Sequence, residues 1–209
     1  MSSTSALALP NLLATTTRAQ LEEEHAIAGT TLTIQWRVTN LGALPIFVYD
    51  RPWCRRKGVV CADHEPCVRL LDRDSLELRY GAAPLPMSGT VSARYVPHTT
   101  EVLPGLTIER RIELPLRTSE YSPYSRGSGD NDEASAVAPF ARSQIKLVVE
   151  YVDGRRATDR RLGIDGAIDF QRPGAVYAGA VTLSARIQGV PLYVTPLSDR
   201  DSFERGCTS

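Results

Sequence analysis

The segment at residues 31–39 alternates strictly between polar and apolar side chains. Its apolar residues occupy the even positions: Leu32, Ile34, Trp36 and Val38. Successive side chains of a β-strand point to opposite faces, so this period of two predicts a half-buried strand. No helix would gather the same residues on one face. We therefore predict that Trp36 points into a hydrophobic core.

The same alternation recurs at residues 108–116, 144–151 and 181–187, with Arg110 as the one charged residue at an apolar position. Shorter apolar runs, separated by Gly and Pro turn signals, lie at residues 46–49, 68–71, 76–80, 91–96 and 190–195. The segment 17–28 fits either a helix or an edge strand. About 8–9 short strands with almost no helix predict an all-β fold, specifically an antiparallel immunoglobulin-like β-sandwich.

The length of 209 residues suits one large all-β domain. We predict a single β-sandwich domain over residues 30–209, preceded at 1–29 by an N-terminal extension or edge element. Two connections exceed what a minimal sandwich needs, a Cys- and Arg-rich one at 52–66 and a Ser-, Gly- and Asp-rich one at 118–142. We interpret both as loop insertions, and we expect proteolysis near Arg126 in the second.

Charge and hydropathy exclude some classes of partner. The 24 basic and 24 acidic residues give no net charge, which argues against nucleic-acid or acidic-membrane binding. No apolar run approaches the roughly 20 residues that cross a bilayer. The N-terminal sequence lacks the basic and continuous apolar regions of a secretory signal, so we expect a cytoplasmic protein. An exported protein is the alternative if a native leader was removed.

Four potential soft-metal ligands follow one another with the spacing C-x6-C-x2-H-x2-C: Cys54, Cys61, His64 and Cys67. Three thiolates and an imidazole form a complete tetrahedral set for Zn²⁺. A disulfide, within this loop or from it to Cys207, is a second interpretation, and separate free thiols are a third. The cations that follow Cys54 favour its thiolate form.

Catalytic signatures are missing from the sequence. It contains no G-x-S-x-G, H-E-x-x-H, Walker A or G-x-G-x-x-G motif, so an enzyme is the less favoured class. Aromatic and Arg residues expected in loops or at strand ends are our candidates for partner binding: Trp53, Arg55, Arg56, Tyr121 and Tyr124. We predict a non-catalytic module that binds a protein partner or forms a homo-oligomer. A metal- or thiol-dependent protein centred on the cysteine loop is the alternative.

Several motifs resemble bacterial immunoglobulin-like domains of the cell-adhesion-related, CARDB-like kind. An alternating strand ends in Asn40-Leu41-Gly42, Val102-Leu103-Pro104-Gly105 opens another, and residues 145–151 close on Asp153-Gly154. The similarity covers residues 30–153. It implies a β-sandwich that serves as a binding or spacer module, often on an exported protein. The strands at 31–39 and 144–152 contain no Cys, so an antibody-type disulfide between sheets is not expected.

Overall fold

The computed structural model describes residues 19–51, 53–56, 59–62, 66–84, 97–121, 140–157, 160–162, 168–170 and 179–195. For 53–56 and 59–62 it describes the backbone alone. These ranges contain strands, turns and bends, and no helix occurs within them. The predicted all-β class is therefore confirmed.

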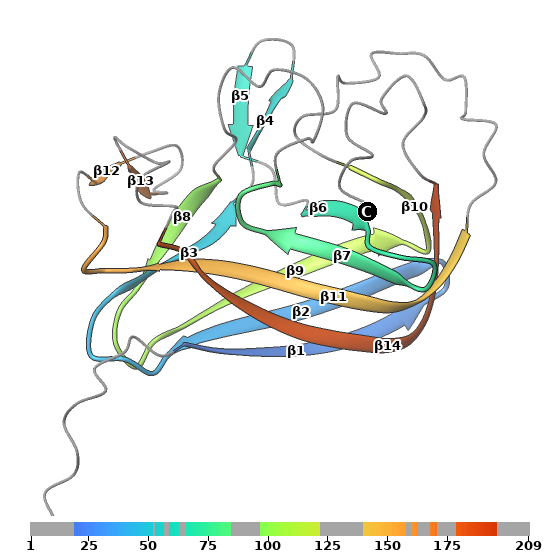
Figure 1. The fold of residues 1–209 in the computed structure, drawn as a ribbon, viewed down its shortest axis with the longest axis horizontal. Helices are drawn as coiled ribbons and strands as arrows, with labels where there is room; N and C mark the ends of the chain where they lie inside the picture. The colour runs from blue at the N-terminus through green and yellow to red at the C-terminus, as the bar shows by residue number, and fades with distance from the viewer. Residues whose placement is uncertain are drawn as a thin grey trace, which may run out of the picture.

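The smaller of the two main sheets has three antiparallel strands in the order β1-β2-β9 (Figure 1). These are β1 (Ala19–Ala28), β2 (Thr31–Asn40) and β9 (Thr107–Pro115). The alternation predicted for β2 is confirmed, because Trp36 and its three apolar neighbours are fully buried. The segment with two interpretations, 17–28, supplies the strand β1 at the edge of this sheet.

The larger sheet has nine strands, and its main path runs β10-β14-β11-β3-β8-β13-β12. The bounds of these strands are β10 (Arg117–Ser119), β14 (Val181–Thr195), β11 (Phe140–Asp153), β3 (Ile46–Arg51), β8 (His98–Val102), β13 (Ile168–Phe170) and β12 (Arg160–Leu162). Off this path, β7 (Ser75–Tyr80) pairs with β11, and β6 (Cys67–Leu70) pairs with β7. A separate two-stranded sheet joins β4 (Trp53–Arg56) to β5 (Val59–Ala62).

The expectation of purely antiparallel sheets is wrong for two strand pairs. β7 runs parallel to β11, and β10 runs parallel to β14. Parallel neighbours need a crossover connection of a dozen or more residues. Both pairs meet this condition, because at least 59 residues separate the facing strands in the sequence. Periodicity alone carries no information about strand direction.

The main core lies between the two sheets. The rings of Trp36 in β2 and Tyr80 in β7 lie 5.1 Å apart, and apolar residues from both sheets surround them. A second, smaller core covers the opposite face of the larger sheet. It consists of Phe47, Tyr49, Val152, Ala157 and Phe170. Both faces of the larger sheet are therefore partly buried.

Both segments that were predicted to be loop insertions contain strand residues. Residues 52–66 include the hairpin β4–β5, and residues 118–142 overlap β10 at one end and β11 at the other. The predicted strands at 181–187 and 190–195 are one strand, β14, with a positive backbone φ at Gly189. The predicted strand at 91–96 and the cleavage site Arg126 lie outside the described residues.

Candidate functional site

The four predicted metal ligands are distributed over three parts of the chain. Cys54 and Cys61 are directly opposite each other in the β4–β5 pair, whereas His64 lies outside the described residues. Cys67 is buried at the start of β6, where its thiol donates a hydrogen bond to the carbonyl oxygen of Tyr121 at 3.1 Å. Among the described residues, no group of three His, Cys, Asp or Glu side chains is placed to hold a metal ion. The zinc site stays a prediction.

The predicted partner-binding residues are also separated. Trp53, Arg55 and Arg56 belong to β4, and Tyr124 lies outside the described residues. Tyr121 is half-buried, packs against the main core and forms a two-way backbone bridge with Val68, each hydrogen bond measuring 2.9 Å. Its contacts attach the segment after β10 to β6. A role for these residues in partner binding stays a prediction.

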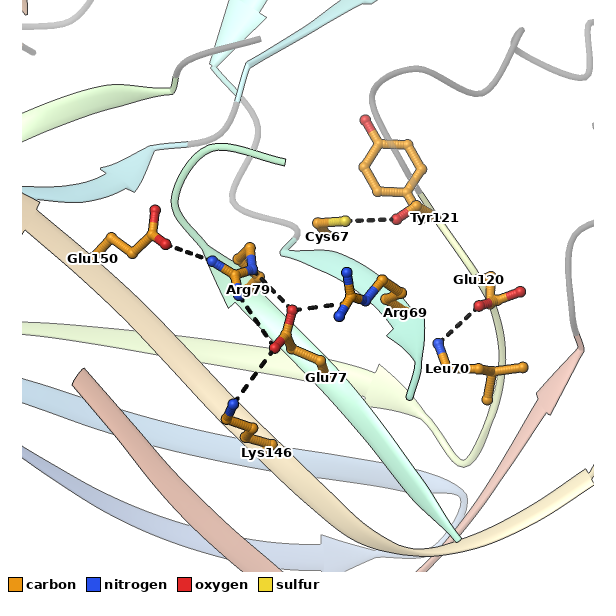
Figure 2. A network of polar contacts seen from close by, with 9 residues as sticks. All are labelled: Cys67, Arg69, Leu70, Glu77, Arg79, Glu120, Tyr121, Lys146 and Glu150. Atoms are coloured by element: carbon orange, nitrogen blue, oxygen red, sulfur yellow. Dashed lines mark hydrogen bonds and ion pairs between the residues drawn. The ribbon is translucent and has the colours of Figure 1, made fainter. Parts of the chain in front are cut away.

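A network of charged side chains lies on the face of β6, β7 and β11 that is turned away from the main core (Figure 2). Glu77 is almost fully buried, and the guanidinium of Arg79 donates to it at 2.8 and 3.2 Å. Arg69 and Lys146 each approach Glu77 to 3.9 Å. Arg79 also donates to Glu150, whose second carboxylate oxygen accepts the Ala82 N–H at 3.1 Å. Arg79, Arg69 and Lys146 therefore surround the Glu77 carboxylate, Arg79 also binds the Glu150 carboxylate, and the network joins three strands.

A second polar cluster lies inside the protein at the end of β3. The Asp50 carboxylate is fully buried, and one of its oxygens accepts hydrogen bonds from Arg110 and, at 2.9 Å, from Thr100. Its other oxygen has no hydrogen-bond partner. Burial raises the pKa of Asp50, and the opposing effects of Arg110 and Thr100 are smaller. The β3–β8 register shifts between Tyr49 and Arg51, so Asp50 occupies an irregularity of the strand.

A third feature is an apolar surface at the opposite end of β3, where the β2–β3 and β8–β9 connections meet (Figure 1). Three leucines there are about half exposed: Leu41 at 57%, Leu103 at 48% and Leu106 at 55%. We call them the leucine tip. The two connections, residues 41–45 and 103–106, contain no charged residue. The leucine tip is therefore apolar at its centre.

Asn40 fixes the backbone of the leucine tip. Its side-chain amide donates to the carbonyl oxygens of Leu44 at 2.8 Å and Val102 at 2.9 Å, and its side-chain oxygen accepts the Gly42 N–H at 2.9 Å. Its backbone carbonyl accepts the Gly105 N–H at 2.9 Å, and Gly105 has a φ of +75° that favours glycine. The fully buried side chain of Asn40 thus holds both connections, so the exposed leucines belong to segments with a fixed backbone.

Sequence reasoning identified the turns at Asn40-Leu41-Gly42 and Pro104-Gly105 but did not predict that they meet. The available signal was the presence of three leucines in turns, where apolar residues are unusual. Arg110 was a similar signal for the Asp50 cluster. Nothing in the local sequence of Glu77 or Glu150 indicates that these carboxylates are buried.

Comparison with known proteins adds no relative, because no family model, no curated protein and no solved structure matches the chain. Among the described residues, no helix has the length and apolar character required to cross a membrane.

Proposed function

We propose that the chain is a non-catalytic binding module, an immunoglobulin-like β-sandwich that docks another protein through its leucine tip. The observation that carries this proposal is the exposure of Leu41, Leu103 and Leu106 on connections that Asn40 holds in place. Exposed apolar side chains that gather at one place on a protein surface commonly mark an interaction site. Loops at the end of a rigid β scaffold are a frequent location for binding residues.

The size of the leucine tip favours a different protein over a second copy as the occupant. Three half-exposed leucines offer far less than the ~800 Å² per partner that a stable standard interface buries. Two tips facing each other would therefore make a weak contact. A partner with a concave apolar pocket gains more, because the pocket walls also cover the flanks of the tip.

The charge of the leucine tip favours an apolar protein pocket over a lipid surface. Peripheral binding to anionic lipid relies on Lys and Arg beside the apolar residues. Residues 40–46 and 102–108 contain neither. The turn that hydrogen-bonds to Pro45 adds Arg155 and Arg156, but it also contains Asp153, and none of the three belongs to the connections that carry the leucines. The absence of charge also disfavours a strongly charged peptide, which would lose hydration without gaining an ion pair.

The test begins with a photo-crosslinking amino acid in place of Leu103 in the full chain, with the same label in place of Leu162 as a control. Leu162 is 75% exposed on β12. This strand pairs with β13, which pairs with β8 at Thr99, near the end of β3 that is opposite the leucine tip. A protein captured from position 103 alone is then purified and titrated by calorimetry against wild type and the triple variant L41S/L103S/L106S. We expect affinity to fall by at least about tenfold, which corresponds to about 1.4 kcal/mol.

The control variant is Leu162→Ser, which should bind as the wild type does. Equal binding by wild type and the triple variant would overturn the proposal. Capture of a second copy alone, or of lipid vesicles instead of protein, would also overturn it.

A further inference from the structure

The hairpin β4–β5 is a sheet of its own (Figure 1). Its antiparallel register joins Trp53 to Ala62, Cys54 to Cys61, Arg55 to Val60 and Arg56 to Val59. Two of the four cysteines of the chain therefore occupy directly opposite positions. The sequence spacing C-x6-C left several pairings open, and the register selects one.

Directly opposite positions meet the distance requirement of a disulfide. The two Cα atoms of such a pair lie about 4.5 or 5.5 Å apart, depending on the hydrogen-bonding pattern. Disulfides join residues whose Cα atoms are roughly 4.4–6.8 Å apart. Both possibilities lie inside this range, so Cys54 and Cys61 can be linked without moving the strands.

Cys67 has contacts outside the hairpin. It pairs in register with Arg79 of β7, it is 8% exposed, and its thiol donates to the Tyr121 carbonyl. A thiol that donates a hydrogen bond is protonated, which is not the form that attacks a disulfide. Cys67 is therefore a poor competitor for either cysteine of the hairpin.

The isolation of the hairpin gives a crosslink a structural consequence. A two-stranded hairpin by itself is marginally stable in water, and no third strand pairs with β4 or β5 among the residues that the structure describes. A covalent bond between opposite strands removes open conformations and so favours the paired state. Oxidation would then convert a weak hairpin into a fixed one.

We propose that Cys54 and Cys61 form a reversible cross-strand disulfide by exchange with a small disulfide such as oxidised glutathione. One cysteine thiolate attacks oxidised glutathione, forming a mixed disulfide and releasing one glutathione thiolate. The second cysteine thiolate attacks the protein sulfur and releases the second glutathione. The two thiols lose two protons and two electrons, and one oxidised glutathione becomes two reduced molecules. Arg55 and Arg56 follow Cys54 in the chain and favour the thiolate form of Cys54.

The test equilibrates the full reduced chain in glutathione buffers of increasing oxidised fraction, followed by alkylation of free thiols and non-reducing peptide mapping. Trypsin cuts between the two cysteines at Arg55, Arg56 and Lys57, and an Asp-specific protease separates Cys61 from Cys67 at Asp63. We expect a crosslinked product that joins residues 50–55 to residues 58–62. Cys67 should be alkylated in the same sample once the chain is denatured.

The matched control moves one thiol by a single position, in the double variant V60C/C61S. Position 60 is opposite Arg55, and adjacent strand positions face opposite sides of a sheet. We expect this variant to need at least about a tenfold more oxidising glutathione ratio to close an internal disulfide. A urea melt of each variant, monitored by Trp fluorescence, establishes that the main core is intact.

Four outcomes would overturn the proposal. These are a crosslink that includes Cys67, stable mixed disulfides at both positions, equal midpoints for V60C/C61S and wild type, and stoichiometric zinc that protects both thiols from alkylation. The last outcome would support the metal-site interpretation of the cysteine loop instead.

Discussion

Arg110 of β9 donates a hydrogen bond to the Asp50 carboxylate of β3, so an ion pair joins the two main sheets through the interior. Arg110 is the register partner of Trp36, and its side chain lies on the core side of β9. Arg110 is the one charged residue at an apolar position of the alternating segment 108–116. The violation is explained by a buried acidic partner on the facing sheet.

Arg110→Met should destabilise the protein by about 3 kcal/mol, because it removes the cation that hydrogen-bonds to the buried Asp50 carboxylate, and Arg51, at 3.9 Å from the same carboxylate, is a weaker partner. The measurement is the free energy of unfolding from urea melts. In the double variant D50L/R110M both charges are absent, and much of the loss should be recovered. Arg111→Met is the matched control on the exposed side of β9, and it should cost less than about 0.5 kcal/mol. Equal losses for the two single variants would contradict a buried ion pair.

The raised pKa of Asp50 predicts a specific pH dependence of stability. Burial raises the pKa above the ordinary value of 3.8, so the folded state holds the proton more tightly than the unfolded state. The stabilisation is complete below the unfolded pKa and is lost as pH rises through the folded pKa. The stability of wild type minus that of Asp50→Asn should therefore fall from about pH 4 upward and then level off.

Urea melts of both proteins in buffers across this range provide the check. A difference that rises with pH would mean that the attraction to Arg110 outweighs the cost of burial. A flat difference would mean that the pKa of Asp50 does not change on folding.

Trp36→Ala should cost about 3–5 kcal/mol, because it removes a fully buried indole and its contact with Tyr80 and leaves a cavity. Arg37→Ala, at the next position of β2, should cost well under about 1 kcal/mol. Arg37 is partly exposed and forms ion pairs with Glu22 and Glu24 of the neighbouring strand β1 at 3.5 and 3.0 Å. Urea melts compare the two. Similar losses would mean that the register of β2 is misassigned.

Gly81→Ala should destabilise the protein by about 1–3 kcal/mol, because a methyl group there meets a side chain that cannot move freely. The added carbon would lie 2.9 Å from Cγ of Glu150 and closer still to Cδ and Oε2. Hydrogen bonds from Arg79 and the Ala82 N–H hold that carboxylate. The same substitution made in a Glu150→Ala background should cost much less. If the two costs in thermal or urea melts are equal, the clash is not the cause.

The local sequence pattern predicted those features of the fold that are properties of a single strand, such as which of its faces is buried. The alternation at 31–39 depends only on which side of β2 faces the core, and it is confirmed. The parallel pairing of β7 with β11 depends on where a distant segment lies, and local periodicity does not encode this. The buried Glu77 is a similar case, because its partners Arg79, Arg69 and Lys146 come from three different strands. The leucine tip was missed because its two turns are about 60 residues apart in the chain.

Asn40→Ala should weaken both the fold and the proposed docking surface. It removes three side-chain hydrogen bonds, to Leu44, Val102 and Gly42, and leaves two carbonyl groups and one N–H without them. At about 1 kcal/mol for each bond, the expected loss of stability is about 2–3 kcal/mol. The three leucines are unchanged in this variant. Any loss of partner affinity therefore measures how much binding depends on a fixed backbone in the two connections. We expect affinity to fall at least about threefold, since the variant must order both connections when it binds.

Asn40→Asp is the informative comparison. The carboxylate still accepts the Gly42 N–H but has no protons to donate to Leu44 and Val102. It should be at least as destabilising as Asn40→Ala, because it also buries a charge without a cation. Calorimetric titration with the purified partner, at a temperature where each variant is folded, measures the affinities. Full affinity in Asn40→Ala, with the expected loss of stability, would mean that the leucines bind without a fixed backbone.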